Sequence, residues 1–281
     1  MKPVTFGIIG AGRIGKLHAD NLLSRVDGAR LKAITDPYLD EEWAAFRNIP
    51  LTGKDHRILL DDPEIDEILI GSPSAEHATQ MIECAEAGKH IFCEKPIALD
   101  PNVIRNALTK VDKSGVKFQG GFNRRFDPNF SAVQHQVASG ALGDPHIIRI
   151  TSRDPAPPPA EYVAGSGGMF LDMTIHDFDM VRFLMGEEPI AVSVTASCQI
   201  DSAIGALSDV DTAVVSLRSA DGKLAVIVNS RRTTYGYDQR IEAHGSKGML
   251  SVGNRVESRL VRADADGITG SKPLYFFLER Y

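Results

Sequence analysis

The first 120 residues alternate between short apolar runs and longer amphipathic segments. Runs typical of buried strands lie at 4–9, 29–35, 65–70, 90–93 and 117–119. Between them, apolar residues recur with helical spacing at 14–23, 75–87 and 101–114, and Gly88 and Gly115 follow the last two of these segments. Strands that alternate with helices in this order predict a doubly wound parallel sheet, which is an α/β fold.

The pattern changes after residue 121. One helix is predicted at 129–139, and most of the remaining chain has strand character, at 147–152, 191–200, 212–217, 224–229, 240–243, 249–252 and 256–261. Asp221-Gly222 and Gly245-Ser246 are hairpin turns between neighbouring runs, which favours antiparallel pairing. The sequence therefore predicts two domains, 1–122 with the doubly wound sheet and 123–281 with an α+β fold and a large, mostly antiparallel sheet.

One segment of the second domain combines apolar and ionisable residues. Residues 167–186, GGMFLDMTIHDFDMVRFLMG, are apolar in most directions when drawn as a helix. Asp172, His176 and Asp179 are spaced i, i+4 and i+7, which places them within an arc of about 60°. Buried carboxylates and imidazoles need partners or a functional cleft. A core hydrogen-bond network is the structural alternative, and a divalent metal site is a weaker one, but two carboxylates in register with a histidine favour a catalytic site.

Composition excludes several classes of partner. The chain has 281 residues, 43% apolar and 24% charged, with a net charge of -6 and no basic stretch that could follow a nucleic acid. No apolar run reaches the ~18 residues of a membrane span, and the start lacks a signal-peptide pattern, so a cytoplasmic protein is expected. Cys84, Cys93 and Cys198 lack the CxxC spacing of zinc sites, so we expect reduced thiols and no bound metal.

A glycine-rich turn follows the first predicted strand. Gly10, Gly12 and Gly15 form GxGxxG around Arg13 and Ile14, at the start of a predicted helix. Bare backbone at such a turn lets a pyrophosphate reach the helix N-terminus. Asp36 ends the second strand, where its carboxylate can accept from both ribose hydroxyls and repel a 2′-phosphate, so NAD is expected rather than NADP. The alternative is a glycine turn of another α/β protein with an incidental Asp.

Two further turns follow strands of the same predicted sheet. Ser72-Pro73 precedes a helix that carries His77, and Glu94-Lys95-Pro96 follows the strand at 90–93. Ligands bind beyond the carboxyl ends of such strands, so these residues are expected near the cofactor. Pro96 restricts the backbone of Lys95 and makes it a candidate for proton transfer or substrate orientation. The alternative for Lys95 is an ordinary solvated lysine.

Four motifs together resemble the glucose-fructose oxidoreductase and inositol dehydrogenase family, over essentially the whole chain. They are GIIGAGRIG near the start, CEKP at 93–96, GGFNRRFD at 120–127 and GGMFLDMTIHDFD at 167–179. The resemblance implies NAD-dependent oxidation of a cyclic polyol such as inositol, in inositol catabolism, with Lys95, Asp172 and His176 as the catalytic set. It also implies a homo-oligomer, expected as a tetramer, built on the open sheet, and further helical chain beyond residue 281, so the C-terminal end is expected to be truncated.

The chemistry of alcohol oxidation agrees with this assignment. A base with a pKa near neutrality must take the hydroxyl proton, which suits His176, while Asp172 orients it or binds a neighbouring hydroxyl and Lys95 donates to the reacting oxygen. Asp179 is expected behind His176. Of the two adjacent arginines, Arg124 is expected to contact the substrate and Arg125 to form an interdomain ion pair. The other expected substrate contacts are Asn123, Asp154 in a proline-rich loop, and Tyr235, whose ring could equally be core packing.

Two other functions remain open at this point. One is an NAD(P)-dependent aldose or other sugar dehydrogenase of the same family. The other is a protein that binds NAD as a sensor without turnover, which the joint presence of Lys95, Asp172 and His176 disfavours.

Overall fold

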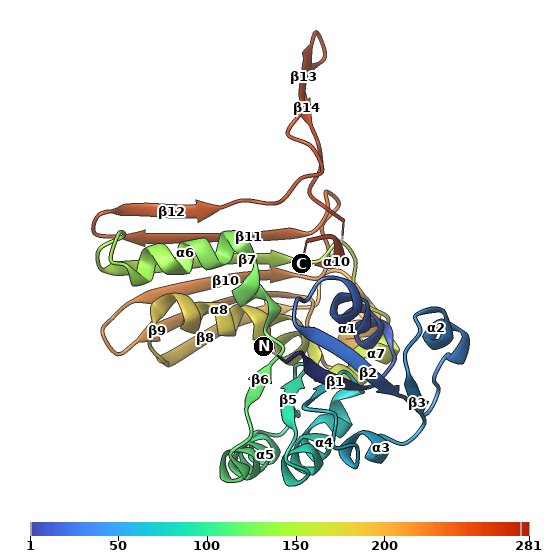
Figure 1. Cartoon of the computed structure of the whole chain (residues 1–281). Helices are drawn as coiled ribbons and strands as arrows, with labels where there is room; N and C mark the ends of the chain where they lie inside the picture. The colour runs from blue at the N-terminus through green and yellow to red at the C-terminus, as the bar shows by residue number, and fades with distance from the viewer. Residues whose placement is uncertain (1, 276, 281) are drawn as a thin grey trace. The chain divides into compact units, whose positions relative to one another are not determined.

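The computed structural model describes residues 2–275 and 277–280 and divides the chain into two compact units, Met1–Gly121 and Phe122–Tyr281 (Figure 1). Within the described residues, no helix has the length and apolar character needed to span a bilayer.

The first unit contains a six-stranded, entirely parallel sheet in the order β3-β2-β1-β4-β5-β6. This order, which grows in both directions from β1, confirms the predicted doubly wound sheet. The strands are β1 (Val4–Ile9), β2 (Ala29–Thr35), β3 (Leu51–Gly53), β4 (Glu67–Ile70), β5 (His90–Cys93) and β6 (Phe118–Gly120).

Helices cover both faces of this sheet. They are α1 (Arg13–Ser24), α2 (Glu41–Phe46), α3 (Arg57–Leu60), α4 (Ser74–Glu86) and α5 (Pro101–Ser114). Consecutive residues of β1 point to opposite faces, so that Ile8 packs with α1 and α2 while Ile9 packs with α3, α4 and α5. The sequence reading missed α2, β3 and α3, which at six, three and four residues are too short to show periodicity.

The second unit contains a mixed sheet in the order β12-β11-β7-β10-β9-β8. Only the β10–β7 pair is parallel, and the other pairs are antiparallel, which confirms the mostly antiparallel sheet. The strands are β7 (Pro145–Arg153), β8 (Pro189–Ser197), β9 (Thr212–Ser219), β10 (Leu224–Ser230), β11 (Asp238–Gly245) and β12 (Gly248–Val252).

Helices pack on one face of this sheet. Its core joins α6 (Pro128–Ala138) and α8 (Ile175–Met185) to alternate residues of β7, β9, β10 and β11 (Figure 1). The residues between them form the opposite face, which we call the open face. It exposes Ile147, Val214, Leu224 and Met249 together with Arg149 and Arg240, and it carries the half-buried Glu242. The remaining helical elements are a 3₁₀ turn, η1 (Asn123–Phe126), a π-helical turn, η2 (Phe170–Thr174), and three short α-helices, α7 (Ala160–Ser166), α9 (Ser202–Ala206) and α10 (Phe277–Arg280).

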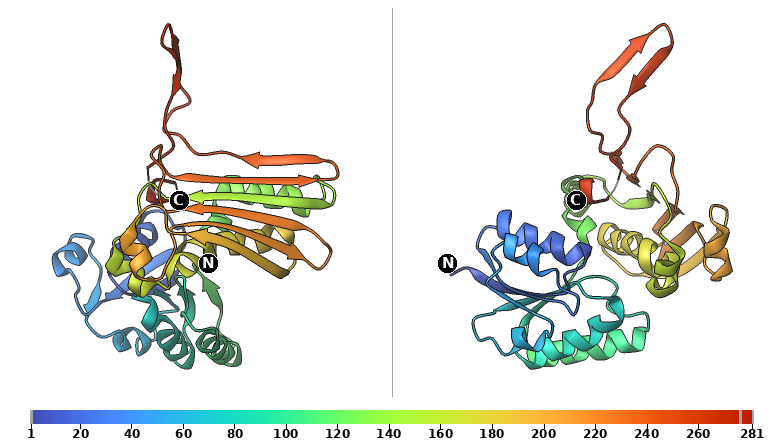
Figure 2. Two further views of the ribbon diagram at one scale, coloured as in Figure 1. Left: turned by 180° about the vertical axis from the view of Figure 1, so that it is seen from behind. Right: turned by 90° about the vertical axis from the view of Figure 1, so that its right-hand side faces the viewer.

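A separate two-stranded hairpin, β13 (Val261–Asp264) and β14 (Gly267–Gly270), extends away from the sheet of its unit (Figure 2). Every residue of both strands is exposed. The predicted strand at 256–261 is wrong, since Val256 forms an isolated bridge to Pro273 and regular pairing begins at Val261. The polar run Glu257-Ser258-Arg259 between them has no apolar alternation that a sheet could bury.

Candidate active site

The glycine turn after β1 is built for close backbone approach. Gly10 has φ +98°, and a Cβ on Gly15 would lie 1.9 Å from the Gly10 carbonyl oxygen, so neither position accepts a side chain. Gly12 is the N-cap of α1, and a Cβ there would meet nothing within 4 Å. The space above Gly12, at the positive end of α1, therefore fits the pyrophosphate of a dinucleotide.

Asp36 closes this turn from the end of β2. Its Oδ2 accepts from the Ala11 amide at 2.7 Å, and its Oδ1 accepts from the Tyr38 amide at 2.8 Å. Each oxygen keeps a second lone pair that can accept from a ribose hydroxyl. Arg13 and Ile14 open α1 directly beside the turn. The donors and acceptors present here fit NAD.

The turn that carries Lys95 follows β5. The Lys95–Pro96 peptide is cis, and the Glu94 amide donates to the carbonyl of Ile70 on β4 at 2.9 Å. The Glu94 carboxylate contacts His18 Nε2 of α1 at 2.8 Å. The contact seen for this carboxylate is with His18, and the expected contact between Glu94 and the cofactor stays a prediction. Sequence reasoning missed His18, which no motif marks.

His77 is almost completely buried, with 1% of its surface exposed. Its Nδ1 lies 2.8 Å from the Pro96 carbonyl oxygen, and its Nε2 lies 2.8 Å from the Ser72 carbonyl oxygen. The ring therefore joins the two turns that the sequence singled out. The hydroxyl of Ser72 donates to Gln80 at 2.6 Å, and Pro73 is the N-cap of α4.

The helix predicted at 167–186 is not one regular helix. Helix α7 ends at Ser166, its C-cap Gly167 has φ +81°, and Gly168 has φ +75°. The chain then forms the π-helical turn η2 before α8 begins at Ile175. A π turn holds more residues than an α turn, so an arc calculated at 100° per residue does not apply between Asp172 and His176. The single continuous α-helix is therefore wrong, whereas the shared direction of Asp172, His176 and Asp179 stays a prediction.

Asp172 is held at both carboxylate oxygens. The Tyr162 hydroxyl donates to Oδ1 at 2.9 Å, and Arg231 Nη1 lies 3.4 Å from Oδ2. The Arg231 side chain is only 1% exposed. Neither partner was predicted, because Tyr162 lies in a short helix and Arg231 follows a strand with no motif of its own.

His176 lies at the start of α8 and packs edge-to-face on Phe122, with ring centroids 6.3 Å apart and planes at 84°. Two buried carboxylates follow it. Asp177 pairs with Arg124 and accepts from Asn229 Nδ2 at 2.8 Å, and burial raises the pKa of this carboxyl despite Arg124.

Asp179 forms a two-pronged ion pair with Arg125 at 2.6 and 2.7 Å. Both residues belong to the second unit, so the expected interdomain ion pair of Arg125 is wrong. Among the described residues, no three histidine, cysteine or acidic side chains are arranged to hold a metal ion. Arg124 is 4% exposed and also donates to Ser152 at 3.0 Å, so its predicted role toward substrate remains a prediction.

The other predicted substrate contacts lie in loops of the second unit. Asp154 follows β7, and burial together with Asp172 and Asp177 raises its pKa to about 6, against the opposite effect of Arg231 and Arg124. The Tyr235 hydroxyl donates to Asp238 at 2.7 Å and accepts from Arg153 at 2.9 Å. Asn123 opens η1, and its Oδ1 is buried without a hydrogen-bond donor among the described residues.

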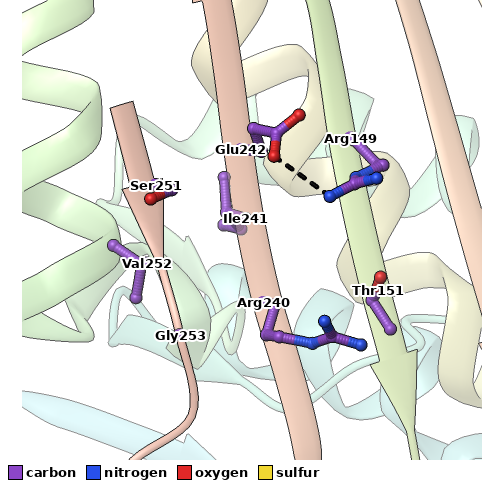
Figure 3. A pocket seen from close by; sticks show the side chains of 8 residues that line it. All are labelled: Arg149, Thr151, Arg240, Ile241, Glu242, Ser251, Val252 and Gly253. Carbon is purple, nitrogen blue, oxygen red and sulfur yellow. Dashed lines mark hydrogen bonds and ion pairs between the residues drawn. The ribbon is translucent and has the colours of Figure 1, made fainter. Parts of the chain in front are cut away.

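A hollow of about 190 Å³ lies on the sheet across β7, β11 and β12 (Figure 3). Figure 3 shows Arg149 reaching across to Glu242, at 3.0 Å, with Arg240 beside Thr151. None of the predicted site residues lines it; the lining residues are Arg149, Thr151, Arg240, Ile241, Glu242, Ser251, Val252 and Gly253.

Known proteins share both units of this chain. Residues 4–122 match the model of an oxidoreductase family with an NAD-binding Rossmann fold, and residues 130–251 match the C-terminal domain of the GFO/IDH/MocA family. The chain is 49% identical to myo-inositol 2-dehydrogenase of Thermotoga maritima, with 98% of this chain and 83% of that protein aligned. It is 47% identical to inositol 2-dehydrogenase of Rhizobium meliloti, with 99% and 84% aligned.

A solved structure extends the likeness to three dimensions. The scyllo-inositol dehydrogenase of Lactobacillus casei with bound NAD(H) and scyllo-inositol superposes with a TM-score of 0.89 at 32% identity, over 99% of this chain and 84% of that one. The chain therefore belongs to the GFO/IDH/MocA family of oxidoreductases, and its first unit is the NAD-binding Rossmann domain of that family.

Proposed function

We propose that this protein oxidises a secondary hydroxyl of myo-inositol to the corresponding ketone, with NAD as hydride acceptor. The observation that carries the proposal is the identity of 47–49% to two inositol 2-dehydrogenases over almost the full chain. The presence of Lys95, Asp172 and His176, three groups suited to alcohol oxidation, supports it.

The first unit supplies the cofactor contacts in this proposal. The backbone amides at Gly12 and the start of α1 hold the pyrophosphate, and Asp36 accepts from the adenosine ribose. When bound, NAD takes the hydride from the carbon that carries the reacting hydroxyl.

Three side chains act on that hydroxyl. His176 takes the proton, because an imidazole is the side chain whose pKa suits proton transfer near neutral pH. Lys95 donates to the oxygen and stabilises the negative charge that develops there. Asp172, held by Tyr162 and Arg231, binds a neighbouring hydroxyl or orients the imidazole. Asn123, Arg124, Asp154 and Tyr235 are the further proposed substrate contacts.

Replacing His176 tests the proposal. His176→Ala should lower kcat by about 10² or more and leave the Kd for NAD unchanged, since a missing general base slows chemistry and not cofactor binding. His135→Ala is the matched control, because His135 is an exposed residue of α6. NADH formation is followed by absorbance, and a near wild-type rate in His176→Ala removes the assigned base.

The alternatives differ in substrate. The likeness to a scyllo-inositol dehydrogenase makes scyllo-inositol the second candidate. Stereoisomers differ in one hydroxyl, and a few hydrogen bonds worth ~1–3 kcal/mol decide between them. Rates with myo-, scyllo- and chiro-inositol and with glucose separate an inositol dehydrogenase from an aldose dehydrogenase, and turnover of any of them rejects a non-catalytic sensor.

We further propose a homo-oligomer, with a tetramer as the expected form, that assembles through the open face. Exposed apolar residues gather there, including Ile147, Val214 and Leu224, and both charge signs occur beside them. A face that carries both signs can pair with a second copy of itself across a twofold axis.

A cytoplasmic location is proposed for the same protein. Cys84, Cys93 and Cys198 are free thiols, and burial raises the pKa of Cys84 to about 12, which keeps its thiol protonated. Unpaired cysteines are typical of reducing compartments. Fractionation of cells that produce the protein tests this location.

A further inference from the structure

We propose that His18 is a positioning residue for Lys95, acting through Glu94. The proposal uses the role assigned to Lys95 in the proposed function. It adds His18, which belongs to none of the recognised motifs, and it explains how the cofactor-binding helix α1 supports the turn after β5.

One carboxylate makes this connection. Glu94 Oε1 lies 2.8 Å from His18 Nε2, and Glu94 Oε2 accepts from the backbone amide of Lys95 at 3.3 Å. In this bond the Nε2–H tautomer of the imidazole donates and the carboxylate oxygen accepts. His18 therefore orients the carboxylate that in turn holds the backbone from which the Lys95 side chain extends.

The surroundings leave the pair little freedom. The His18 and Glu94 side chains are 22% and 20% exposed. Phe92 contacts the imidazole edge-on, with centroids 5.4 Å apart. A Cβ on Gly121 would lie 2.9 Å from Glu94 Oε2, so the carboxylate fits only because residue 121 has no side chain. A hydrogen bond that is partly shielded from water fixes geometry better than an exposed one.

A second histidine holds the other side of the same turn. His77 Nδ1 contacts the Pro96 carbonyl at 2.8 Å. Lys95 thus lies between two residues that are each fixed by an imidazole. Misplacement of a catalytic group by about 1 Å can lower the rate about 10²-fold. The Lys95 amine has to reach the oxygen of the reacting hydroxyl, so its rate contribution depends on how firmly this turn is held.

The unit contains a matched control. His56 Nε2 lies 2.6 Å from Glu83, with side-chain exposures of 24% and 38%, so it is a second histidine–glutamate pair of similar burial. It joins the residue before α3 to α4 and does not touch the turn after β5. Replacing His56 removes an equivalent bond without affecting Lys95.

The kinetic experiment compares His18→Leu, His18→Gln and His56→Leu. We expect His18→Leu to lower kcat about tenfold, with the Kd for NAD and the KM for inositol within about twofold of wild type, because positioning is expressed in the transition state. His18→Gln should recover most of the rate, since its amide can donate to Glu94, and His56→Leu should match wild type. Equal kcat values in His18→Leu and His56→Leu overturn the proposal.

Hydrogen–deuterium exchange at the Lys95 amide provides a readout that needs no substrate. It should be at least several-fold faster in His18→Leu than in wild type or His56→Leu, because the acceptor of this amide is no longer oriented. Unchanged exchange overturns the inference even if activity falls. A wild-type protein that oxidises no polyol overturns the proposed function alone, and the exchange comparison still decides whether His18 holds the turn.

Discussion

Three carboxylates of the candidate site have different kinds of interaction partner. Asp36 accepts from two backbone amides, Asp172 from a tyrosine hydroxyl and a buried guanidinium, and Asp154 is enclosed with a raised pKa. The kind of partner decides what each group can do. Backbone amides leave lone pairs of Asp36 for a ligand, a tyrosine and an arginine fix the direction of the Asp172 carboxylate, and enclosure favours the protonated form of Asp154.

Asp36 should set the choice between NAD and NADP. Wild type should use NAD with the higher kcat/KM, because the carboxylate repels a 2′-phosphate. In Asp36→Ser the ratio of the two efficiencies should fall by about tenfold or more, equivalent to ~1.4 kcal/mol. Since Asp36 also accepts from Ala11, a thermal unfolding curve serves as the control for folding. A native preference for NADP contradicts the prediction.

Asp154 should make the protein less stable as pH rises. Its pKa is about 6 when folded and 3.8 in its ordinary environment, so the folded state binds the proton more tightly and stability falls as pH rises from about 4 through 6. A shift of about two units corresponds to ~3 kcal/mol.

Asp154→Asn imitates the protonated carboxyl and tests this loss. The variant should unfold at a higher temperature than wild type at pH 7.5 and exceed wild type by a clearly smaller margin at pH 4.5. A difference in Tm that is equal at both pH values refutes the assignment. Because Asp154 is also a proposed substrate contact, the stabilised variant should have a lower kcat than wild type. Such a loss of activity is common when a stabilising substitution removes a residue of the site.

Among the elements, two helices offer a matched comparison. The sequence Asp-Pro-Asn opens both α5, at Asp100, and α6, at Asp127. Asp100 accepts from the Asn102 amide at 2.8 Å and is exposed. Asp127 accepts from the Asn129 and Phe130 amides and also contacts Arg280 Nε of α10 at 3.3 Å, with both side chains almost fully buried.

Removal of the two caps should therefore differ in cost. Asp100→Ala should lower the free energy of unfolding by ~1 kcal/mol, the usual value of an N-cap. Asp127→Ala should lower it by ~3 kcal/mol or more, because it also leaves a buried arginine without its carboxylate. Urea unfolding of both variants measures the difference, and equal losses would show that the contact with Arg280 contributes nothing.

Local sequence rules predicted some elements and not others. The bounds of α5 followed from Asp100, Pro101 and Gly115, which are strong start and stop signals. The π turn between Asp172 and His176 could not be predicted in this way. Apolar residues point in nearly every direction along this segment, so its pattern does not show where an α-helix changes to a π turn. The contacts of Arg124 and Arg125 inside their own unit were equally hidden, since ion pairs more than 50 residues apart leave no pattern in sequence.

For the whole molecule, the parallel sheet of the first unit was predictable because glycines and a terminal aspartate occur at fixed places around its central strands. The support of the candidate site was not. His18 lies 76 residues from Glu94 and Arg231 lies 59 residues from Asp172, so only the fold brings these partners together. Tyr162 is ten residues from Asp172, but it reaches the carboxylate from a separate short helix.

The open face should determine assembly. Val214→Asp places a charge among its apolar residues and should shift the sedimentation of the protein to that of a smaller species. Val26→Asp is the control, because Val26 is exposed to a similar degree, 47% against 43%, but lies in the first unit. If both variants sediment as wild type does, assembly uses another surface.

The π-helical turn at Phe170–Thr174 has a consequence for how this chain can change over time. Such a turn carries about one residue more than an α-helix of the same rise needs. Losing that residue lets the coil tighten into a regular form of nearly the same rise and total rotation, so the chain on either side keeps its direction. Loss of a residue inside the regular helix α8 instead turns everything that follows it by about 100°. This stretch can therefore change in length by one residue, whereas α8 can change only by substitution.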